Sequence, residues 1–263
     1  MGSQPVIIFP VSAFADNYIW ILTDPSKKQA IVVDPGDASP VIATLDAAEI
    51  QPVAIVITHH HHDHSGGISQ LLAHYGSMPV YGGKDSQVAL VDQLVDQPFT
   101  ITLNHHPISF EVIAIPGHTL DHVAFYTKGH LFCGDTLFGG GCGRVFEGTH
   151  DQLFQSLKRL ASLPNDTNIY CGHEYTVNNL LFAKQVEPNN QEIIKRLVSV
   201  KALRELNKPS LPSTLAEEKA TNPFLRCHIP EVITTVQQQF NVETTVDSDI
   251  FYRVRTWKDQ FKA

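Results

Sequence analysis

Cysteine is scarce in this sequence: the chain of 263 residues has four, with no CxxC pair and no dense framework. Secreted domains that depend on disulfides carry many closely spaced cysteines, whereas thiols stay reduced in the cytosol. We therefore expect a cytoplasmic protein with free thiols at Cys133, Cys142, Cys171 and Cys227.

Long apolar runs and an export signal are missing as well. No stretch approaches the ~20 apolar residues that a membrane span requires, and the N-terminus has no basic segment followed by an apolar one. The sequence therefore predicts a protein that neither crosses a membrane nor is exported.

An excess of positive charge is also absent. The net charge is −8 and the isoelectric point about 5.9, which disfavours broad nucleic-acid binding, because such binding needs a basic face. An anionic substrate would need a few basic side chains placed close to it. The hydrophobic fraction of 43% is that of an ordinary soluble globular protein, and the length allows one large domain or two smaller ones.

Histidine, in contrast, is abundant, and five of the 14 histidines lie in the segment THHHHDH at 58–64. An apolar β-branched run at 53–57 predicts a buried strand before it, and Ser-Gly-Gly leads into a helical pattern at 68–75. The imidazoles are therefore expected on a tight loop at the C-terminal end of a strand, where open α/β sheets place their sites. A His tag or flexible chelating tract is the alternative, but tags lie at termini.

Alternation along an extended loop gives these side chains two directions. His59 and His61 would point to one side, while Asp63 and His64, after the turn, would face a second point nearby. The two intervening histidines alternate away and are not expected to be ligands. Because Zn, Fe and Mn accept neutral imidazole and carboxylate, the loop is a candidate site for two metal ions.

Three later segments end a predicted strand with glycine followed by a polar residue: His118, Asp135 and His173. We expect the strand ends to bring these side chains to one rim with the histidine loop. A single histidine at a strand end is more often structural, but three such repeats beside the loop favour a metal site. A carboxylate such as Asp135 can bridge two cations and hold them about 3.5–4 Å apart, as in two-metal hydrolytic sites.

The secondary-structure pattern changes near residue 172. We predict early strands at 5–9, 17–22 and 29–33, a hairpin at 123–133, and helices at 39–50, 85–94 and 149–163. Ser39 and Thr149 are the expected N-caps. Further helices are predicted at 176–186, 190–206, 214–219 and 230–240, with no strand signal among them. The sequence thus predicts a catalytic domain at 1–172 and a helical domain at 173–263.

The metal-site pattern resembles that of the metallo-β-lactamase superfamily, and within it the glyoxalase II (hydroxyacylglutathione hydrolase) family. The supporting stretches are DNYIW at 16–20, GDTLF at 134–138, GCGR at 141–144, FEGT at 146–149, CGHEYT at 171–176, NPFLR at 222–226 and KDQF at 258–261. The resemblance covers nearly the whole chain. It implies an α+β fold, in which an αββα metallo-β-lactamase sandwich is followed by a small C-terminal α-helical domain that binds substrate.

The resemblance also implies roles for the ligands and a cofactor of two divalent metal ions per chain, zinc ahead of iron or manganese. His59, His61 and His118 would hold the first metal, Asp63, His64 and His173 the second, and Asp135 would bridge them. Two cations that share a water lower its pKa, so the implied nucleophile is a metal-bridged hydroxide. Asp63 would help to orient it.

The implied reaction is hydrolysis of the thioester S-D-lactoylglutathione to D-lactate and glutathione, a step of methylglyoxal detoxification. Glutathione carries two carboxylates, and Arg144, Arg255 and Lys258 match family positions that would bind it, with Phe146 and Tyr175 beside them. From composition alone, Arg255 and Lys258 would belong to a solvent-exposed basic face of the protein. The expected partner is this small thioester, and the expected state is a monomer.

Several features keep two interpretations. Asp34 is either a turn residue or a carboxylate behind a ligand histidine, and His122 either supports a ligand or is structural. Glycines 139–141 either form a flexible loop or present backbone N–H groups to a ligand. Asp121 stands where the family usually has glycine, and Phe146 where some members have tyrosine.

Rival functions are tied to specific features. A mononuclear iron persulfide dioxygenase or a lactonase would share the fold but lack the C-terminal segment with NPFxR and RxxK. A non-catalytic metal- or glutathione-binding module would not be expected to keep every ligand position. A Ser-His-Asp hydrolase finds no support, because the sequence contains no G-x-S-x-G elbow.

Overall fold

The computed structural model describes residues 6–262, which form two compact units. Within the described residues, unit 1 consists of 6–114 and 121–134, and unit 2 of 115–120 and 135–262. The domain boundary predicted near residue 172 is a different division of the chain and stays a prediction. Of the strand predicted at 5–9, Pro5 lies outside the described residues.

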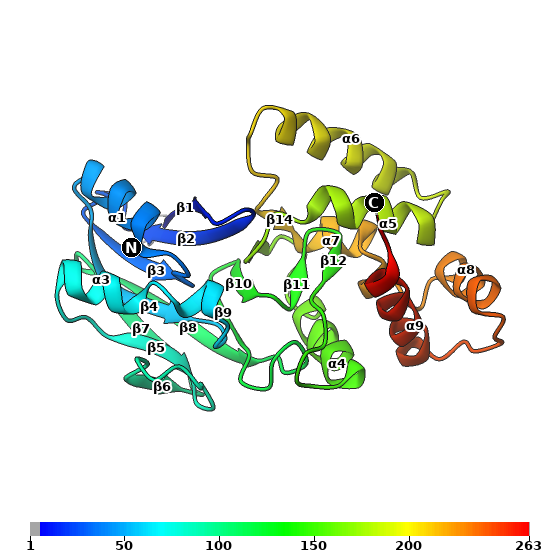
Figure 1. Cartoon of the computed structure of the whole chain (residues 1–263), viewed down its shortest axis with the longest axis horizontal. Helices are drawn as coiled ribbons and strands as arrows, with labels where there is room; N and C mark the ends of the chain where they lie inside the picture. The colour runs from blue at the N-terminus through cyan, green and yellow to red at the C-terminus, as the bar shows by residue number, and fades with distance from the viewer. Residues whose placement is uncertain (1–5, 263) are drawn as a thin grey trace. The chain divides into compact units, whose positions relative to one another are not determined.

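Unit 1 is built on two β-sheets (Figure 1). The first has the strand order β1-β2-β3-β4-β5-β6, antiparallel from β1 to β3 and parallel from β3 to β6. Its strands are β1 Ile7–Ala13, β2 Asn17–Thr23, β3 Gln29–Val33, β4 Gln51–Ile57, β5 Val80–Gly83 and β6 Gln93–Val95. The second is an antiparallel meander of β7 Phe99–Leu103, β8 His106–Ala114, β9 Val123–Thr127 and β10 His130–Gly134.

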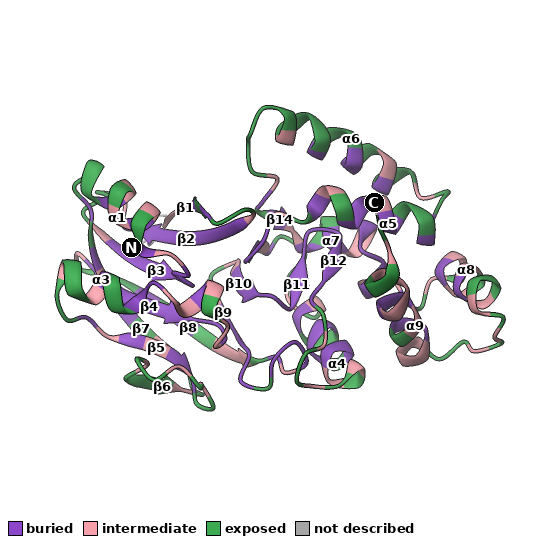
Figure 2. Cartoon of the chain, viewed as in Figure 1, coloured by how far each residue is buried: buried purple, intermediate pink, exposed green. Residues whose placement is uncertain are grey.

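The central strands β2, β3 and β4 are almost wholly buried (Figure 2), because they carry apolar residues on both faces. One face of the sheet packs against α1 (Ala38–Ala47) and α3 (Ile68–Tyr75) through Val41, Leu45 and Leu71. Toward the second sheet, Tyr81 stacks on Phe99 with the ring centroids 4.7 Å apart. The loops that leave β3 and β4 therefore start from a firmly packed base.

Unit 2 is mostly helical. Its elements are β11 Leu137–Phe138, β12 Gly141–Cys142, α4 His150–Ala161, β13 Asn168–Cys171, α5 Thr176–Val186, α6 Gln191–Glu205, β14 Ser213–Thr214, α7 Leu215–Thr221, the short 3₁₀ turn η1 Pro223–Leu225, α8 Pro230–Phe240 and α9 Asp247–Gln260. Helices α5 and α6 share an apolar core that includes Leu180, Ile193 and Leu197. No helix within residues 6–262 is long and apolar enough to cross a membrane.

Several predicted elements are confirmed. The hairpin is β9–β10, the helices at 176–186 and 230–240 have the predicted bounds, and α4 begins with a capping box between Thr149 and Gln152. Ser39 is not the N-cap of α1: Asp37 holds that position, and its carboxylate accepts from the Ser39 N–H at 2.9 Å. The cap prediction was therefore wrong by two residues.

Three further predictions differ from the structure. The segment 85–94 is not a helix: most of it forms turns and irregular structure, and its end bonds to the neighbouring strand, where Asp92 exchanges hydrogen bonds with Val80 through both its N–H and its side chain. Helix α9 was not predicted, since β-branched and aromatic residues are weak helix formers; packing of Phe251 and Val254 stabilises it. The C-terminal part also contains a strand, the two-residue β14, which pairs with β13.

Candidate metal centre and adjoining cavity

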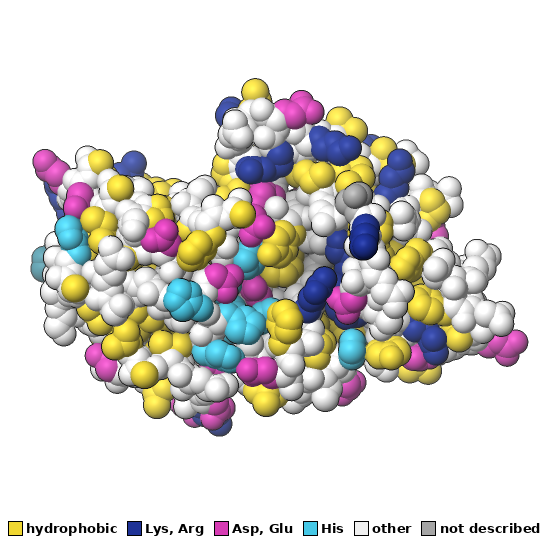
Figure 3. Space-filling view, in the orientation of Figure 1, with side chains coloured by type: hydrophobic (Ala, Val, Ile, Leu, Met, Phe, Trp, Pro, Cys, Tyr) yellow, Lys and Arg dark blue, Asp and Glu magenta, His cyan; other side chains and the backbone are white. Residues whose placement is uncertain are grey.

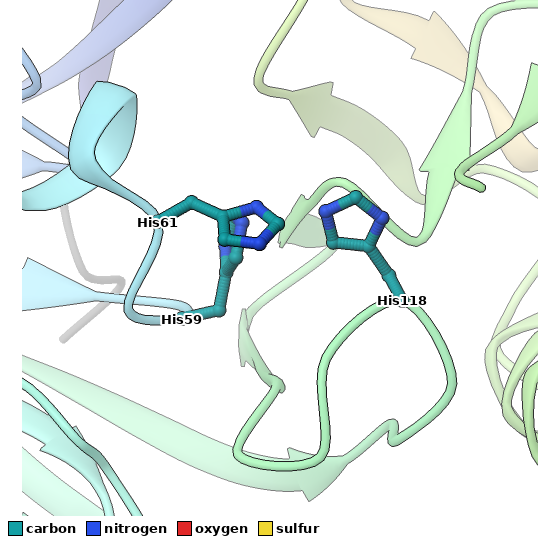
Figure 4. A group of neighbouring side chains, drawn as sticks. All are labelled: His59, His61 and His118. Atoms are coloured by element: carbon teal, nitrogen blue, oxygen red, sulfur yellow. The ribbon is translucent and has the colours of Figure 1, made fainter. Parts of the chain in front are cut away.

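The histidine loop leaves β4 at Thr58 and closes into the one-turn helix α2 (His62–Ser65). The Ser65 hydroxyl donates to the carbonyls of His60 and His61 at 3.1 and 3.0 Å, which tightens the turn. The His59 ring lies 4.7 Å from that of His61 and 4.2 Å from that of His64. In Figure 4 the side chains of His59 and His61 leave the loop and converge, so that their rings overlap in the view.

Asp34 anchors the first residue of this loop, Thr58. It directly follows β3 and has a φ of +53°, and its carboxylate accepts from the Thr58 N–H at 2.8 Å and the Thr58 hydroxyl at 2.7 Å. The same carboxylate lies 3.0 Å from Nδ1 of His64. An acceptor at this position keeps the ring proton on Nδ1 and leaves Nε2 for a metal. Of the two interpretations of Asp34, the structure therefore supports the carboxylate behind a ligand histidine.

Asp63 is oriented by residues that the sequence did not single out. The Asn17 amide donates to Oδ2 of Asp63 at 3.0 Å, and that oxygen lies 3.7 Å from Nε2 of His64. Gly36 makes room for the loop, since a Cβ there would come within 1.9 Å of the Asp63 carbonyl oxygen. Asn17 belongs to the DNYIW stretch, so its match to the family was the sequence feature that could have identified it. Apart from its place in a turn, no sequence feature indicated a role for Gly36.

Two further histidines of unit 1, His60 and His122, have supporting positions. His60 turns to Asp121, with Nδ1 2.9 Å from Oδ1, and the other carboxylate oxygen of Asp121 accepts from the Gln87 N–H at 3.3 Å. His122 stacks on His59 with centroids 4.4 Å apart and planes inclined by 10°. The extra carboxylate at 121 thus fixes His60, which lies between the ligand candidates His59 and His61 in the sequence, and His122 supports the ring of His59.

Unit 2 contributes a second set of donors around Asp135. Its Oδ2 lies 3.6 Å from Nε2 of His118 and 3.3 Å from Nε2 of His173, and all three side chains are buried. Nδ1 of His118 lies 2.8 Å from the carbonyl oxygen of Arg144, which favours a proton on that nitrogen. A buried carboxylate oxygen next to two Nε2 atoms brings together three donor groups of the kind that bind divalent cations.

The donor chemistry of both units fits divalent Zn, Fe or Mn. Three imidazoles have Nδ1 beside an oxygen atom, from Thr58 for His59, Asp34 for His64 and Arg144 for His118. Neutral imidazoles oriented in this way, together with carboxylates, are the usual ligands of these metals. All seven predicted ligands are therefore placed within two donor sets, His59, His61, Asp63 and His64 in unit 1 and His118, Asp135 and His173 in unit 2.

A cavity of about 390 Å³ opens in unit 2 beside His118 and Asp135. All five predicted substrate-binding residues line it: Arg144, Phe146, Tyr175, Arg255 and Lys258. Figure 3 shows Lys and Arg side chains, in dark blue, over the C-terminal elements around α5 and α9. A volume of this size suits a small-molecule ligand. The cavity is lined by positively charged side chains, although the chain as a whole has a net charge of −8.

Arg255 and Lys258 are not solvated surface cations. Arg255 is only 3% exposed; it donates to the Cys142 carbonyl at 2.8 Å and to Asp259 at 3.0 Å, while its buried Nε has no hydrogen-bond partner among the described residues. A buried donor of this kind calls for a partner. Burial, and then the charge of Arg255, lowers the pKa of Lys258 to about 8. Arg144 is more exposed and lies 3.6 Å from Asp259.

The two aromatic residues take different places. Tyr175 stacks on the His173 ring with centroids 4.7 Å apart and planes within 7°, so it supports a ligand candidate as well as lining the cavity. Phe146 is 63% exposed, and its ring lies edge-on to His118 at 5.2 Å. The phenyl group thus covers the imidazole without offering a hydrogen bond.

The glycine-rich segment forms the hairpin β11–β12 rather than an open loop. The Gly140 N–H donates inward to Glu218 at 2.8 Å, and the carbonyl oxygens of Gly139 and Gly141 accept from Asn179 and Asn222 at 3.0 and 2.8 Å. Gly140 has a φ of +65°, which favours glycine. Its N–H is therefore not available to a ligand, and side chains hold the segment at each glycine.

Comparison with known proteins decides the family. The model for the metallo-beta-lactamase superfamily matches residues 14–173, and the model for the hydroxyacylglutathione hydrolase C-terminus matches residues 174–261. A hydroxyacylglutathione hydrolase of Aeromonas hydrophila is 48% identical over 98% of this chain and 99% of its own length. One of Alkalilimnicola ehrlichii is 47% identical over 96% and 98%. The chain belongs to the hydroxyacylglutathione hydrolase family.

Membership of this family confirms the predicted α+β class and the αββα metallo-β-lactamase fold followed by a helical C-terminal region. Among solved structures, that of TTHA1623 in a di-iron-bound form is 25% identical, with a TM-score of 0.58, and covers 82% of this chain and all of its own. The family assignment also confirms that the chain is a hydrolase.

Proposed function

We propose that this protein hydrolyses S-D-lactoylglutathione to D-lactate and glutathione. One observation carries the proposal: the same cavity of unit 2 is lined by two metal-ligand candidates, His118 and Asp135, and by three cations, Arg144, Arg255 and Lys258. A thioester whose glutathione carboxylates meet these cations would have its acyl end beside the metal-binding donors. The names of the relatives support the same substrate class.

The proposal includes a centre of two divalent metal ions. One ion would be bound by His59, His61 and His118. The other would be bound by Asp63, His64 and His173, and Asp135 would be a ligand of both. Zinc is our first choice, and the di-iron-bound form of TTHA1623 supports iron as an alternative. When bound, such a pair supplies a water of lowered pKa and polarises the thioester carbonyl.

The chain's own residues supply orientation and binding. Arg255 and Lys258 would hold a carboxylate of glutathione, and the unpartnered Nε of Arg255 supports this role. Asp63, aligned by Asn17, would accept a hydrogen bond from the attacking water and fix its direction. A thiolate is a good leaving group, so the reaction requires no strong general acid from the protein.

The remaining parts of the proposal concern the setting of the enzyme. All four cysteines are free and buried, which supports a reducing compartment, and we propose the cytoplasm. A monomer remains the expected state. The C-terminal family match at 174–261 favours the thioesterase over a persulfide dioxygenase or lactonase, which would not be expected to carry this segment.

Turnover of two thioesters tests the proposal. The metal-assayed protein should hydrolyse S-D-lactoylglutathione rapidly, and an S-lactoyl thioester of N-acetylcysteamine, which lacks both carboxylates, should have a KM at least about tenfold higher, because the cations of the cavity would have nothing to bind. Asp135→Ala and chelation should abolish both reactions. Cleavage of neither thioester by metal-loaded protein would refute the function, and equal KM values would refute the role of the cavity.

A further inference from the structure

A fully buried carboxylate of unit 2 holds the hairpin β11–β12. Glu218 of α7 accepts from the Gly140 N–H at 2.8 Å and from the Asn222 amide at 3.1 Å through one oxygen. Its other oxygen accepts from Ser213 at 2.6 Å and from the guanidinium of Arg196 at 2.5 Å. Both oxygens are thus committed to buried donors.

Asn222 completes the hold on the hairpin. Its amide donates to the carbonyl oxygens of Gly141 at 2.8 Å and Phe138 at 3.3 Å, while its own side-chain oxygen caps η1 by accepting from the Phe224 N–H. Glu218 therefore binds a donor of the hairpin, and Asn222 binds two of its acceptors. Together they fix the backbone of a hairpin whose residues Phe138 and Cys142 line the cavity.

The hairpin leads directly to the acceptors of Arg255. Nη1 of Arg255 donates to the carbonyl oxygens of Cys142 and Gly143 at 2.8 and 3.3 Å. These carbonyls set the angle at which the guanidinium meets the cavity. Gly143 has little freedom of its own, since a Cβ there would lie 1.9 Å from the Asp135 carbonyl oxygen. A shift of the hairpin at Gly140 or Gly141 would therefore move the acceptors that hold Arg255.

A buried ion pair needs a reason other than stability. Replacing such a pair by apolar residues is often neutral or stabilising, because desolvation offsets the attraction between the charges. Arg196 and Glu218 are 5% and 0% exposed, so removing these two charges from water on folding costs a large free energy. A role in fixing one conformation of the hairpin accounts for the pair, because one charged carboxylate accepts from four separate donors at once.

We infer that Glu218, assisted by Asn222, is a positioning residue for glutathione binding: it fixes the β11–β12 hairpin and thereby the direction of Arg255. The inference rests on the proposed function, since it assigns Arg255 to the glutathione carboxylate. Glu218 is not among the residues that line the cavity, and the partners found for its carboxylate among residues 6–262 are Gly140, Asn222, Ser213 and Arg196. Its effect should therefore appear in substrate binding and not in the chemical step.

The test compares Glu218→Gln with a matched neighbour, Glu217→Gln. Both carboxylates pair with Arg196, but Glu217 is 44% exposed, approaches Nε at 3.3 Å and makes no bond to the hairpin. Glu218→Gln should raise KM for S-D-lactoylglutathione about tenfold, the effect of one charge-assisted hydrogen bond, with kcat within about twofold of the wild type. Glu217→Gln should leave both constants within about twofold.

A second variant and a binding measurement keep the test decisive. Asn222→Ser removes the amide donors to the hairpin and should raise KM in the same direction; it decides the question if Glu218→Gln does not fold. Calorimetric titration with glutathione should show weaker binding in both variants. An unchanged KM, or a lower kcat at unchanged KM, would overturn the inference. If wild-type protein cleaves no glutathione thioester, the proposed function fails instead, and glutathione titration alone then tests the positioning role.

Discussion

Lys258 gives the protein a pH dependence that can be worked out from its surroundings. Its ammonium lies 4.9 Å from the Phe261 ring and 5.4 Å from the Phe182 ring, and burial together with the nearby Arg255 lowers its pKa to about 8. A substrate carboxylate is attracted to the charged form only. Lys258 is almost fully protonated well below pH 8, so the affinity for the substrate should be highest there and should fall as the pH rises through that value.

The size of the effect follows from the pKa. With a value of about 8, roughly nine tenths of Lys258 is charged at pH 7 and roughly one tenth at pH 9. If only the charged form binds substrate productively, kcat/KM falls about tenfold between these two values. Lys258→Arg keeps its charge throughout the range, because the pKa of arginine lies above 12.

The assay is the ratio of kcat/KM for wild type to that for Lys258→Arg, measured from pH 6.5 to 9.5. Titration of the substrate and of the metal centre affects both proteins and cancels in the ratio. We expect a flat ratio below pH 7 and a fall centred near pH 8. A ratio that stays constant to pH 9.5 would refute the assignment of Lys258 as a titrating substrate contact.

Three further changes test the supports of the site. Asp34→Asn should lower metal affinity about 10–100-fold in competition with a chelator, because His64 loses its oriented proton acceptor. Asn17→Ala should reduce kcat about tenfold with KM nearly unchanged, since one hydrogen bond to Asp63 is lost; a change in KM alone would contradict this. Phe251→Ala should cost about 3–5 kcal/mol in thermal unfolding, because Phe251 is fully buried against Phe154 and Phe224.

The sequence was most informative where local pattern and chemistry coincide. A strand followed by THHHHDH predicts both the turn and the donors, and the structure places His59, His61, Asp63 and His64 on that loop. Capping is local as well, and Thr149 is the N-cap of α4. The hairpin at β9–β10 follows from its Lys-Gly turn in the same way.

Prediction failed where distant partners decide. The sequence could not decide between the two interpretations of Asp34, because its partners, Thr58 and His64, lie 24 and 30 residues further along the chain. The segment 85–94 has a helical pattern, yet its end joins the edge of a sheet through backbone hydrogen bonds. No local pattern distinguishes Glu218 from Glu217, since adjacent acids on a short helix usually face solvent; only the fold buries one of them.

The central claim is a thioesterase that needs two metal ions per chain, and a metal titration of apoprotein tests it most directly. Zinc would be added in steps while hydrolysis of S-D-lactoylglutathione and bound metal are measured on the same samples. The account predicts activity that reaches its plateau at two equivalents per chain and is absent from Asp135→Ala at any metal content. Full activity at one equivalent, or two bound ions without thioester cleavage, would contradict it.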